Sequence, residues 1–293
     1  MSTKNSTILA VGAAGDCAGL VLPALARRGA VVRGLIRNDS QADAVRTHGA
    51  TEIAIGDLND RASLDAALRG IDSVFYIAPA FLANEADIGK RMVEAAVQAG
   101  VRRIVFSAVI HPTLAVLENH EAKCPVEEAI LSSGMEYVFL HPALFFQNFA
   151  GSWAAVLKTG VLAEPWSTET HFTRVDYRDV AEVAAIALTE DRLTFGTFEL
   201  CAEGNLNRRE VAALVGEVLR RPIEAARVRP AEMDNTTGDS AKTVQMTAMK
   251  RMFDWYDEHD LLGNALTLSA ILGRQPRSLR VYFEELASGG QWP

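Results

Sequence analysis

Residues 7–19 read TILAVGAAGDCAG, a short apolar run followed by a cluster of glycine and alanine. An apolar run of this length that ends at glycine predicts a buried β-strand. The next residues, 17–28, have helical spacing, although Pro23 predicts a kink or a loose first half-turn there. The segment therefore predicts a strand that turns tightly into a helix, which is the opening unit of many α/β folds.

The same alternation of strand and helix continues through the first half of the chain. The near-continuous apolar strands indicate a parallel sheet that is covered on both faces. We therefore predict an α/β protein with a Rossmann-type, doubly wound parallel sheet. The predicted strands are 7–11, 31–36, 52–55, 74–78, 103–107 and 137–140, and the predicted helices are 17–28, 40–47, 61–69, 84–99 and 125–132.

The alternation weakens after residue 150. Residues 173–188 predict a strand followed by a helix, and 195–200 and 208–219 predict a further strand and helix. Residues 222–242 predict mainly loop, and 246–286 predict helices. We expect a Rossmann domain at 1–150 to which 173–202 returns, and a smaller, discontinuous C-terminal α+β lobe at 151–172 and 203–293.

Composition excludes several classes of protein. The chain has 293 residues, a net charge of −8 and no long basic run, so nucleic acid and anionic membranes are poor partners. Its three cysteines, Cys17, Cys124 and Cys201, match no metal-ligand or disulfide pattern. The N-terminus is polar and lacks the apolar core of a signal peptide, and the apolar stretch 137–157 is interrupted by polar residues. We expect a cytoplasmic protein without a metal site.

The turn after the first strand has the spacing Gly-x-x-Gly-x-x-Ala at Gly12, Gly15 and Ala18. Small residues let the backbone turn tightly and let a diphosphate approach the N-terminus of the helix, where unpaired amides favour anions. The turn therefore predicts a dinucleotide site. An ordinary glycine-rich turn without a ligand remains the alternative.

The end of the second strand indicates which dinucleotide binds. NAD-selective proteins usually place Asp or Glu here to bind the ribose 2′-hydroxyl, but this chain has Arg37. A guanidinium suits a 2′-phosphate through paired, charge-assisted hydrogen bonds. We therefore expect NADP(H) in preference to NAD(H), with a solvated surface arginine as the alternative.

Two further strand ends fit the same ligand. Asp57 could accept a hydrogen bond from the adenine amino group while Leu58 packs on the ring; alternatively, Asp57 caps the next helix. Ala78 and Pro79 follow the fourth strand, where small residues would let the ribose and diphosphate pass.

Several motifs together resemble the NmrA-like family of atypical short-chain dehydrogenases. They lie at residues 12–19, 32–38, 56–60, 141–149, 175–181 and 272–277. The resemblance implies a Rossmann domain, NADP(H) binding, and a smaller C-terminal lobe on the substrate side that covers the nicotinamide end. Some members reduce quinones, azo compounds or phenylpropanoids, whereas others bind the dinucleotide without turnover and regulate a protein partner.

The resemblance also points to candidate catalytic residues. Typical short-chain dehydrogenases carry Tyr-x-x-x-Lys, but here Asn119 stands four residues before Lys123. Lys123 occupies the family's lysine position and could hydrogen-bond the nicotinamide ribose or protonate an oxyanion, the second role requiring a lowered pKa. His120 could transfer protons or be structural. Ser107, at the end of the fifth strand, could bond a substrate oxygen or only cap the strand.

The segment after the sixth strand is rich in aromatic rings, which could surround a nicotinamide and a planar, apolar substrate. Core packing is the alternative for two of its three phenylalanines. Phe146, Asn148 and Phe149 are the predicted substrate residues, and Trp153, Trp166 and Phe172 could extend the same wall. The predicted cofactor residues are Gly12, Ala14, Gly15, Asp16, Cys17, Ala18, Arg37, Asp57, Leu58, Ala78, Pro79, Lys123, Pro142 and Phe145.

Two hypotheses for function follow. In the first, the protein is an NADPH-dependent reductase of a small apolar acceptor, as Lys123 and the aromatic segment suggest. In the second, it is a non-catalytic NADP(H) sensor that binds a protein partner, as the missing tyrosine suggests.

Overall fold

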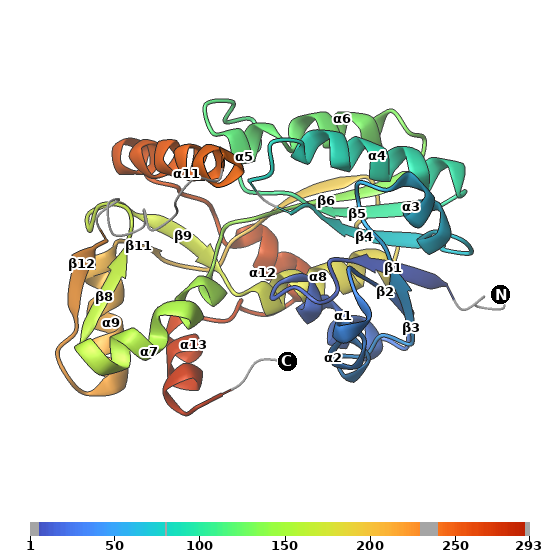
Figure 1. Cartoon of the computed structure of the whole chain (residues 1–293). Helices are drawn as coiled ribbons and strands as arrows, with labels where there is room; N and C mark the ends of the chain where they lie inside the picture. Colours follow the sequence, from blue (N-terminus) through green and yellow to red (C-terminus); the bar gives the residue numbers. More distant parts are fainter. Residues whose placement is uncertain (1–5, 80, 229–239, 291–293) are drawn as a thin grey trace. The chain divides into compact units, whose positions relative to one another are not determined.

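The computed structural model describes residues 6–79, 81–228 and 240–290 (Figure 1). The chain divides into two compact units. The first contains Met1–Pro142 and Arg178–Phe198, and the second contains Ala143–Tyr177 and Glu199–Trp292. The two units are described in turn.

The first unit is built on a seven-stranded sheet whose order is β10-β6-β5-β4-β1-β2-β3. Strands β1 to β6 pair in parallel, and the order reverses at the junction of β1 and β4. This topology confirms the predicted Rossmann-type sheet. The strands are β1 (Thr7–Val11), β2 (Val31–Ile36), β3 (Glu52–Ile55), β4 (Ser73–Ile77), β5 (Arg103–Ser107), β6 (Glu136–Pro142) and β10 (Gly196–Leu200).

Helices cover both faces of this sheet, as the apolar strands require. Helices α3, α4 and α6 lie on one face, and α1, α2 and α8 lie on the other (Figure 1). The helices of this unit are α1 (Val21–Ala26), α2 (Ala42–Thr47), α3 (Arg61–Ala67), α4 (Glu85–Gln98), α5 (Glu118–Glu121), α6 (Cys124–Leu131) and α8 (Tyr177–Thr189), with 3₁₀ turns η1 (Ala18–Leu20) and η2 (Asp39–Gln41).

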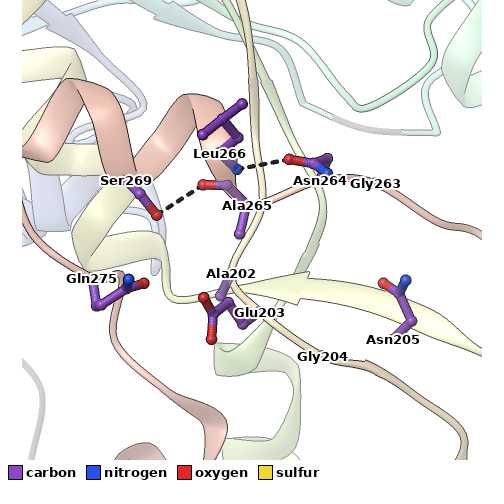
Figure 2. Close-up of a pocket in the computed structure, with 10 residues that line it drawn as sticks. All are labelled: Ala202, Glu203, Gly204, Asn205, Gly263, Asn264, Ala265, Leu266, Ser269 and Gln275. Carbon is purple, nitrogen blue, oxygen red and sulfur yellow. Dashed lines mark hydrogen bonds between the residues drawn. The ribbon is translucent and has the colours of Figure 1, made fainter.

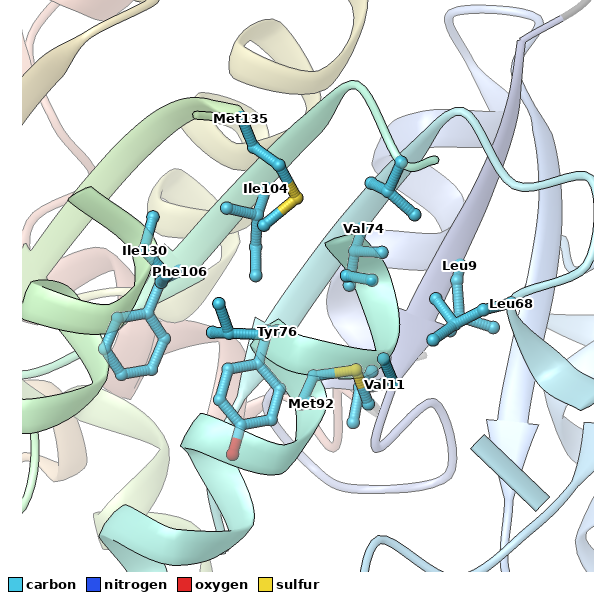
Figure 3. Close-up of a cluster of buried hydrophobic side chains, with 14 of the residues drawn as sticks. Leu9, Val11, Leu68, Val74, Tyr76, Met92, Ile104, Phe106, Ile130 and Met135 are labelled. Atoms are coloured by element: carbon cyan, nitrogen blue, oxygen red, sulfur yellow. The ribbon is translucent and has the colours of Figure 1, made fainter. Parts of the chain in front are cut away.

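The core beneath α3, α4 and α6 fixes the central strands. Side chains from β1, β4 and β5 meet those of the helices, as Figure 3 shows for Leu9, Tyr76, Met92, Phe106 and Ile130. The rings of Tyr76 and Phe106 stack with their centroids 5.4 Å apart. Burial of such side chains holds the carboxyl ends of neighbouring strands in register.

The first helix begins later than the sequence predicts. The backbone forms the 3₁₀ turn η1 before α1 starts at Val21, so residues 12–17 remain a loop. Pro23 is the third residue of α1, where an amide would have no acceptor within the helix. The predicted loose first turn is therefore present, and the proline costs no helical hydrogen bond.

The second unit contains two small sheets and five α-helices among its described residues. Sheet order is β11-β9-β7 in one and β12-β8 in the other. Its elements are β7 (Leu144–Phe145), η3 (Phe146–Phe149), α7 (Ala150–Thr159), β8 (Val161–Glu164), β9 (Phe172–Val175), β11 (Asn205–Leu206), α9 (Arg208–Leu219), β12 (Glu224–Arg227), α11 (Ser240–His259), α12 (Leu266–Leu272) and α13 (Leu279–Ala287).

One prediction for this unit was wrong in part. Residues 222–242 were expected to be mainly loop, but β12 pairs in parallel with β8 there, and α11 begins at Ser240. Alanine and charged residues carry little β-propensity, so the sequence contains no strand signal at 224–227. The rest of that prediction, at 229–239, lies outside the described residues.

Candidate functional site

The loop between β1 and α1 presents unpaired amides at the carboxyl edge of the sheet. The amide of Gly15 donates to the carbonyl of Gly12 over 2.8 Å, and Gly12 has a φ of +72° that favours glycine. The amides of Ala14, Asp16, Cys17 and Ala18 have no acceptor among the residues that the structure describes. Oriented amides of this kind bind phosphate oxygens. The loop therefore fits a dinucleotide diphosphate.

Small side chains keep this loop open. A Cβ atom placed on Gly12 would lie 3.6 Å from the Cβ of Ala18 and 3.7 Å from Ile77, the last residue of β4. Ala18 itself is buried, whereas Ala14, Gly15 and Asp16 are exposed. Cys17 is half-buried, and burial raises the pKa of its thiol to about 12, so it is no thiolate at neutral pH.

Arg37 directly follows β2, the neighbour of β1. Its side chain is exposed and has no hydrogen-bond or ion-pair partner among the described residues. Its backbone amide is held by the side chain of Gln41, which also completes a capping box with Asn38. The backbone is thus fixed while the guanidinium stays available for an anionic ligand.

The acidic residue after β3 is not a helix cap. Asp60 caps α3 by accepting the amide of Ala62 over 3.0 Å, so the alternative role of Asp57 as that cap was wrong. One carboxylate oxygen of Asp57 accepts the amide of Asn59 over 2.8 Å. Leu58 is half-buried against the core below. The predicted adenine contacts of Asp57 and Leu58 remain predictions.

Lys123 is buried and forms an ion pair with Glu85. Lys123 precedes α6 at its N-cap, and Glu85 is the first residue of α4. Their side chains are 7% and 2% exposed. Burial lowers the pKa of Lys123 to about 8, because desolvation penalises the ammonium. A lowered pKa is in the direction that a role of Lys123 as a proton donor requires.

Glu85 is the residue that sequence reasoning missed. It stands at the start of a predicted helix, where an acidic residue is ordinary because the helix dipole favours it. Nothing in the sequence relates it to a lysine 38 positions away. Only the packing of α4 against α6 brings the two side chains together.

The other two candidate catalytic residues are His120, on α5, and Ser107, at the end of β5. His120 is fully buried, its Nδ1 lies 3.1 Å from the carbonyl oxygen of His111, and burial lowers the pKa of its ring. This geometry favours the structural alternative for His120. Ser107 is buried at the end of β5, with Ile77 of β4 and Leu140 of β6 as its strand partners.

The aromatic segment divides between core and surface. Phe146 and Phe149 are buried in the core of the second unit, which supports the core-packing alternative for these two. Phe145 is half-buried and meets the ring of Tyr177 edge-on at 4.8 Å, and Asn148 is exposed. Pro142 is buried as the last residue of β6.

Trp153, Trp166 and Phe172, which were predicted to extend the aromatic wall, are also buried. Trp153 stacks on Phe283, with centroids 5.6 Å apart, and Trp166 packs on Phe172 and Tyr256. All of these rings are buried. We therefore assign Trp153, Trp166 and Phe172 to the hydrophobic core.

The second unit also contains a cavity of about 420 Å³ that the sequence does not predict. It lies where the loop after β10 meets the segment that leads into α12 (Figure 2). Its polar side chains are Glu203, Asn205, Asn264, Ser269 and Gln275. Asn264 accepts the amide of Leu266 over 2.8 Å and so shapes the rim.

Comparison with known proteins establishes the family. The model of the NmrA-like family matches residues 4–285. The chain belongs to the NmrA-like family. An NAD(P)H azoreductase of Xenophilus azovorans is 26% identical over 281 residues, which cover 92% of this chain and 94% of the relative. A (4-alkanoyl-5-oxo-2,5-dihydrofuran-3-yl)methyl phosphate reductase of Streptomyces griseus is 33% identical over 219 residues, 74% of this chain and 75% of the relative.

Solved structures of this kind share the fold. An NADPH-dependent quinone oxidoreductase of Escherichia coli, in complex with NADPH, is 20% identical with a TM-score of 0.81, and covers 96% of this chain and 99% of its own. A Citrobacter triphenylmethane reductase, complexed with NADP(H), is 22% identical with a TM-score of 0.80 over the same shares. Within the described residues, we find no helix long and apolar enough to cross a membrane.

Proposed function

We propose that this NmrA-like protein is an NADPH-dependent oxidoreductase that transfers a hydride to a small apolar acceptor of the quinone, azo or enone type. The observation that carries the proposal is the loop at residues 12–18. Its four unpaired amides stand beside β4, at the point where the strand order reverses, which is where open α/β sheets bind ligands. The similar proteins named above are an NAD(P)H azoreductase, a (4-alkanoyl-5-oxo-2,5-dihydrofuran-3-yl)methyl phosphate reductase, an NADPH-dependent quinone oxidoreductase and a triphenylmethane reductase.

The choice of NADPH over NADH rests on Arg37. A guanidinium that has no protein partner can donate two hydrogen bonds to a 2′-phosphate. No acidic residue stands at this position to bind a 2′-hydroxyl instead. Asp57, Leu58, Ala78 and Pro79 would line the adenosine side of the same edge.

The chemistry divides between cofactor and protein. Bound NADPH supplies the hydride. We propose that the Lys123 ammonium hydrogen-bonds the ribose or gives a proton to the oxygen or nitrogen that becomes negative as the acceptor is reduced. A hydride and a proton together complete the two-electron reduction. A tyrosine acid is therefore not required.

The segment that follows β6 offers further candidate contacts. Asn148 is exposed, so we propose it as an acceptor contact, and we propose the half-buried Phe145 as a cofactor contact, as the sequence predicts. The division into a Rossmann domain at 1–150, with 173–202 returning, and a substrate-side lobe stays a prediction.

The test is NADPH oxidation, followed at 340 nm, across quinones, azo dyes and enones. We expect turnover of at least one acceptor class, with NADH slower. The Lys123→Met variant should oxidise NADPH more slowly, through a lower kcat or a higher KM for NADPH. Tight NADPH binding with no oxidation of any acceptor by the wild-type protein would favour the non-catalytic sensor instead.

A further inference from the structure

The Lys123 ammonium is held by a group from a different helix. Glu85 opens α4, whereas Lys123 precedes α6, and these two helices pack side by side (Figure 1). The packing is close, because a Cβ atom on Gly89 of α4 would come within 2.3 Å of Val126 of α6. The ion pair therefore lies across a tight helix contact that leaves little room for either side chain to move.

The second oxygen of the Glu85 carboxylate contacts the backbone of the turn after β4. It accepts the backbone amide of Phe81 over 3.1 Å, and the amide of Glu85 donates to the carbonyl of Leu82 over 3.1 Å. Phe81 has a φ of +63°, a left-handed conformation that side chains disfavour. One carboxylate thus stabilises an unfavourable turn after β4 and holds Lys123 as well.

No other carboxylate contacts the Lys123 ammonium among the residues that the structure describes. On α5, the ring of His120 is directed to the carbonyl of His111. On α6, the carboxylate of Glu127 lies 2.7 Å from the Nε2 of His141 on β6. Glu85 is therefore the group that opposes the cost of burying the ammonium.

We propose that Glu85 is the positioning residue for Lys123, which it holds as an ammonium at the carboxyl edge of the sheet while fixing the turn at Phe81. The inference rests on the proposed function, in which Lys123 serves the cofactor or acceptor. In this proposal Glu85 has no direct role at the cofactor or the acceptor. It acts through Lys123, by keeping the lysine charged, and through the turn beside the expected path of the ribose.

The charge of Lys123 can be measured without turnover. The chain has six lysines, Lys4, Lys90, Lys123, Lys158, Lys242 and Lys250, so NMR of ¹³C-labelled lysine gives few signals, and Lys123→Arg identifies the one of interest. In Glu85→Gln we expect the titration midpoint of Lys123 to fall by about one pH unit or more, because an opposite charge at contact distance is worth that much. Glu94→Gln, an exposed change on the same helix, should leave the midpoint unchanged.

Activity gives the second readout. In Glu85→Gln the alkaline limb of kcat/KM should move to lower pH with the NMR midpoint, so the loss of activity is larger at pH 8 than at pH 6. A purely structural role would lower activity equally at both. If Glu85→Gln does not fold, Glu85→Asp keeps the charge on a shorter side chain, and we expect a smaller shift in the same direction.

The proposal is overturned if the Lys123 midpoint in Glu85→Gln stays at the wild-type value or rises, or if Glu85→Asp matches the wild type in both readouts. Failure of the proposed function is a separate result. In that case the wild-type protein oxidises no NADPH with any acceptor, while the NMR titration still decides whether Glu85 controls the charge of Lys123.

Discussion

At the scale of single residues, the role proposed for Lys123 predicts how activity depends on pH. Its pKa is lowered to about 8 by burial, and only the ammonium can donate a proton or a charged hydrogen bond. We expect kcat/KM with NADPH to be constant below pH 7 and to fall as the pH rises through about 8. The Lys123→Arg variant should lose this limb while keeping part of the activity, since arginine stays charged.

The size of the effect distinguishes the two roles that remain open for Lys123. Loss of a general acid costs typically 10²- to 10⁴-fold in kcat. Loss of a ribose contact raises the KM for NADPH instead. Steady-state kinetics of Lys123→Met at pH 7 therefore separates them. Unchanged kcat and unchanged KM would exclude Lys123 from the site.

We expect His120 to affect stability rather than turnover, because its buried ring favours a structural role. Burial lowers the pKa of its ring, so at mildly acidic pH the unfolded chain binds a proton that the folded protein does not bind. The free energy of unfolding should consequently decrease as the pH falls below about 6.5, the ordinary value for histidine. The His120→Asn variant keeps a side-chain donor near the His111 carbonyl but cannot titrate. Urea unfolding at pH 7.5 and 5.5 should show a smaller loss for the variant, and an equal loss would refute this explanation.

At the scale of elements, the turn from β1 to α1 is where sequence and function are most closely linked. Gly12→Ala places a side chain at a φ of +72°, which costs about 1–2 kcal/mol. Gly70 has the same φ, and a Cβ atom there would meet nothing within 4 Å. We expect both alanine variants to be destabilised alike, while only Gly12→Ala weakens NADPH binding. Equal NADPH affinity in the two variants would remove the turn from the site.

The secondary structure was predictable where one local signal dominates. Strands β1, β2, β3 and β5 match their predicted bounds, and the apolar runs of β1, β2 and β3 end at a glycine or a charged residue. The start of α1 was not predictable, because the loop closes through contacts such as the amide of Ala13 with the carbonyl of Leu35 on β2. Strand β12 was missed for a related reason, since pairing with β8 rather than propensity creates it.

Candidate site residues were likewise predictable where local sequence order indicates them, and not where tertiary packing decides. Gly12, Gly15 and Arg37 follow from the order of strand, turn and helix along the chain. Glu85 could not be predicted, because its importance depends on the packing of α4 on α6. In the aromatic segment, residue type alone does not predict which side chains stay accessible. Phe145, Phe146 and Phe149 have the same chemistry, and only their burial separates them.

At the scale of the whole molecule, the second unit depends on a buried charge network. Glu164 accepts hydrogen bonds from Arg174 and Arg208 over 3.2 and 3.3 Å, and both arginines are at most 3% exposed. Their guanidinium groups also lie over Phe149, Phe172 and Trp166. Burial lowers the pKa of both arginines, and the Glu164 carboxylate opposes that shift.

Glu164→Gln would remove the carboxylate that two buried cations share, at a cost of about 3–5 kcal/mol. Trp153, Trp166 and Trp255 lie in the described part of the second unit, so tryptophan fluorescence follows its unfolding in urea. The control Glu169→Gln removes the exposed partner of Arg209 and should unfold at nearly the wild-type urea concentration. Equal midpoints for the two variants would show that the network does not stabilise the unit.

The central claim is that residues 12–18 and Arg37 form an NADP(H) site. Its most direct measurement is a fluorescence titration with NADPH and NADH of the wild-type protein, of Arg37→Ala, and of Arg46→Ala as an exposed control on α2. We predict that NADPH binds more tightly than NADH, and that Arg37→Ala weakens NADPH alone by about tenfold or more, the value of a charged hydrogen bond. Equal affinity of the wild-type protein for both nucleotides, or an Arg37→Ala variant that binds NADPH as tightly as the wild type, would contradict the account.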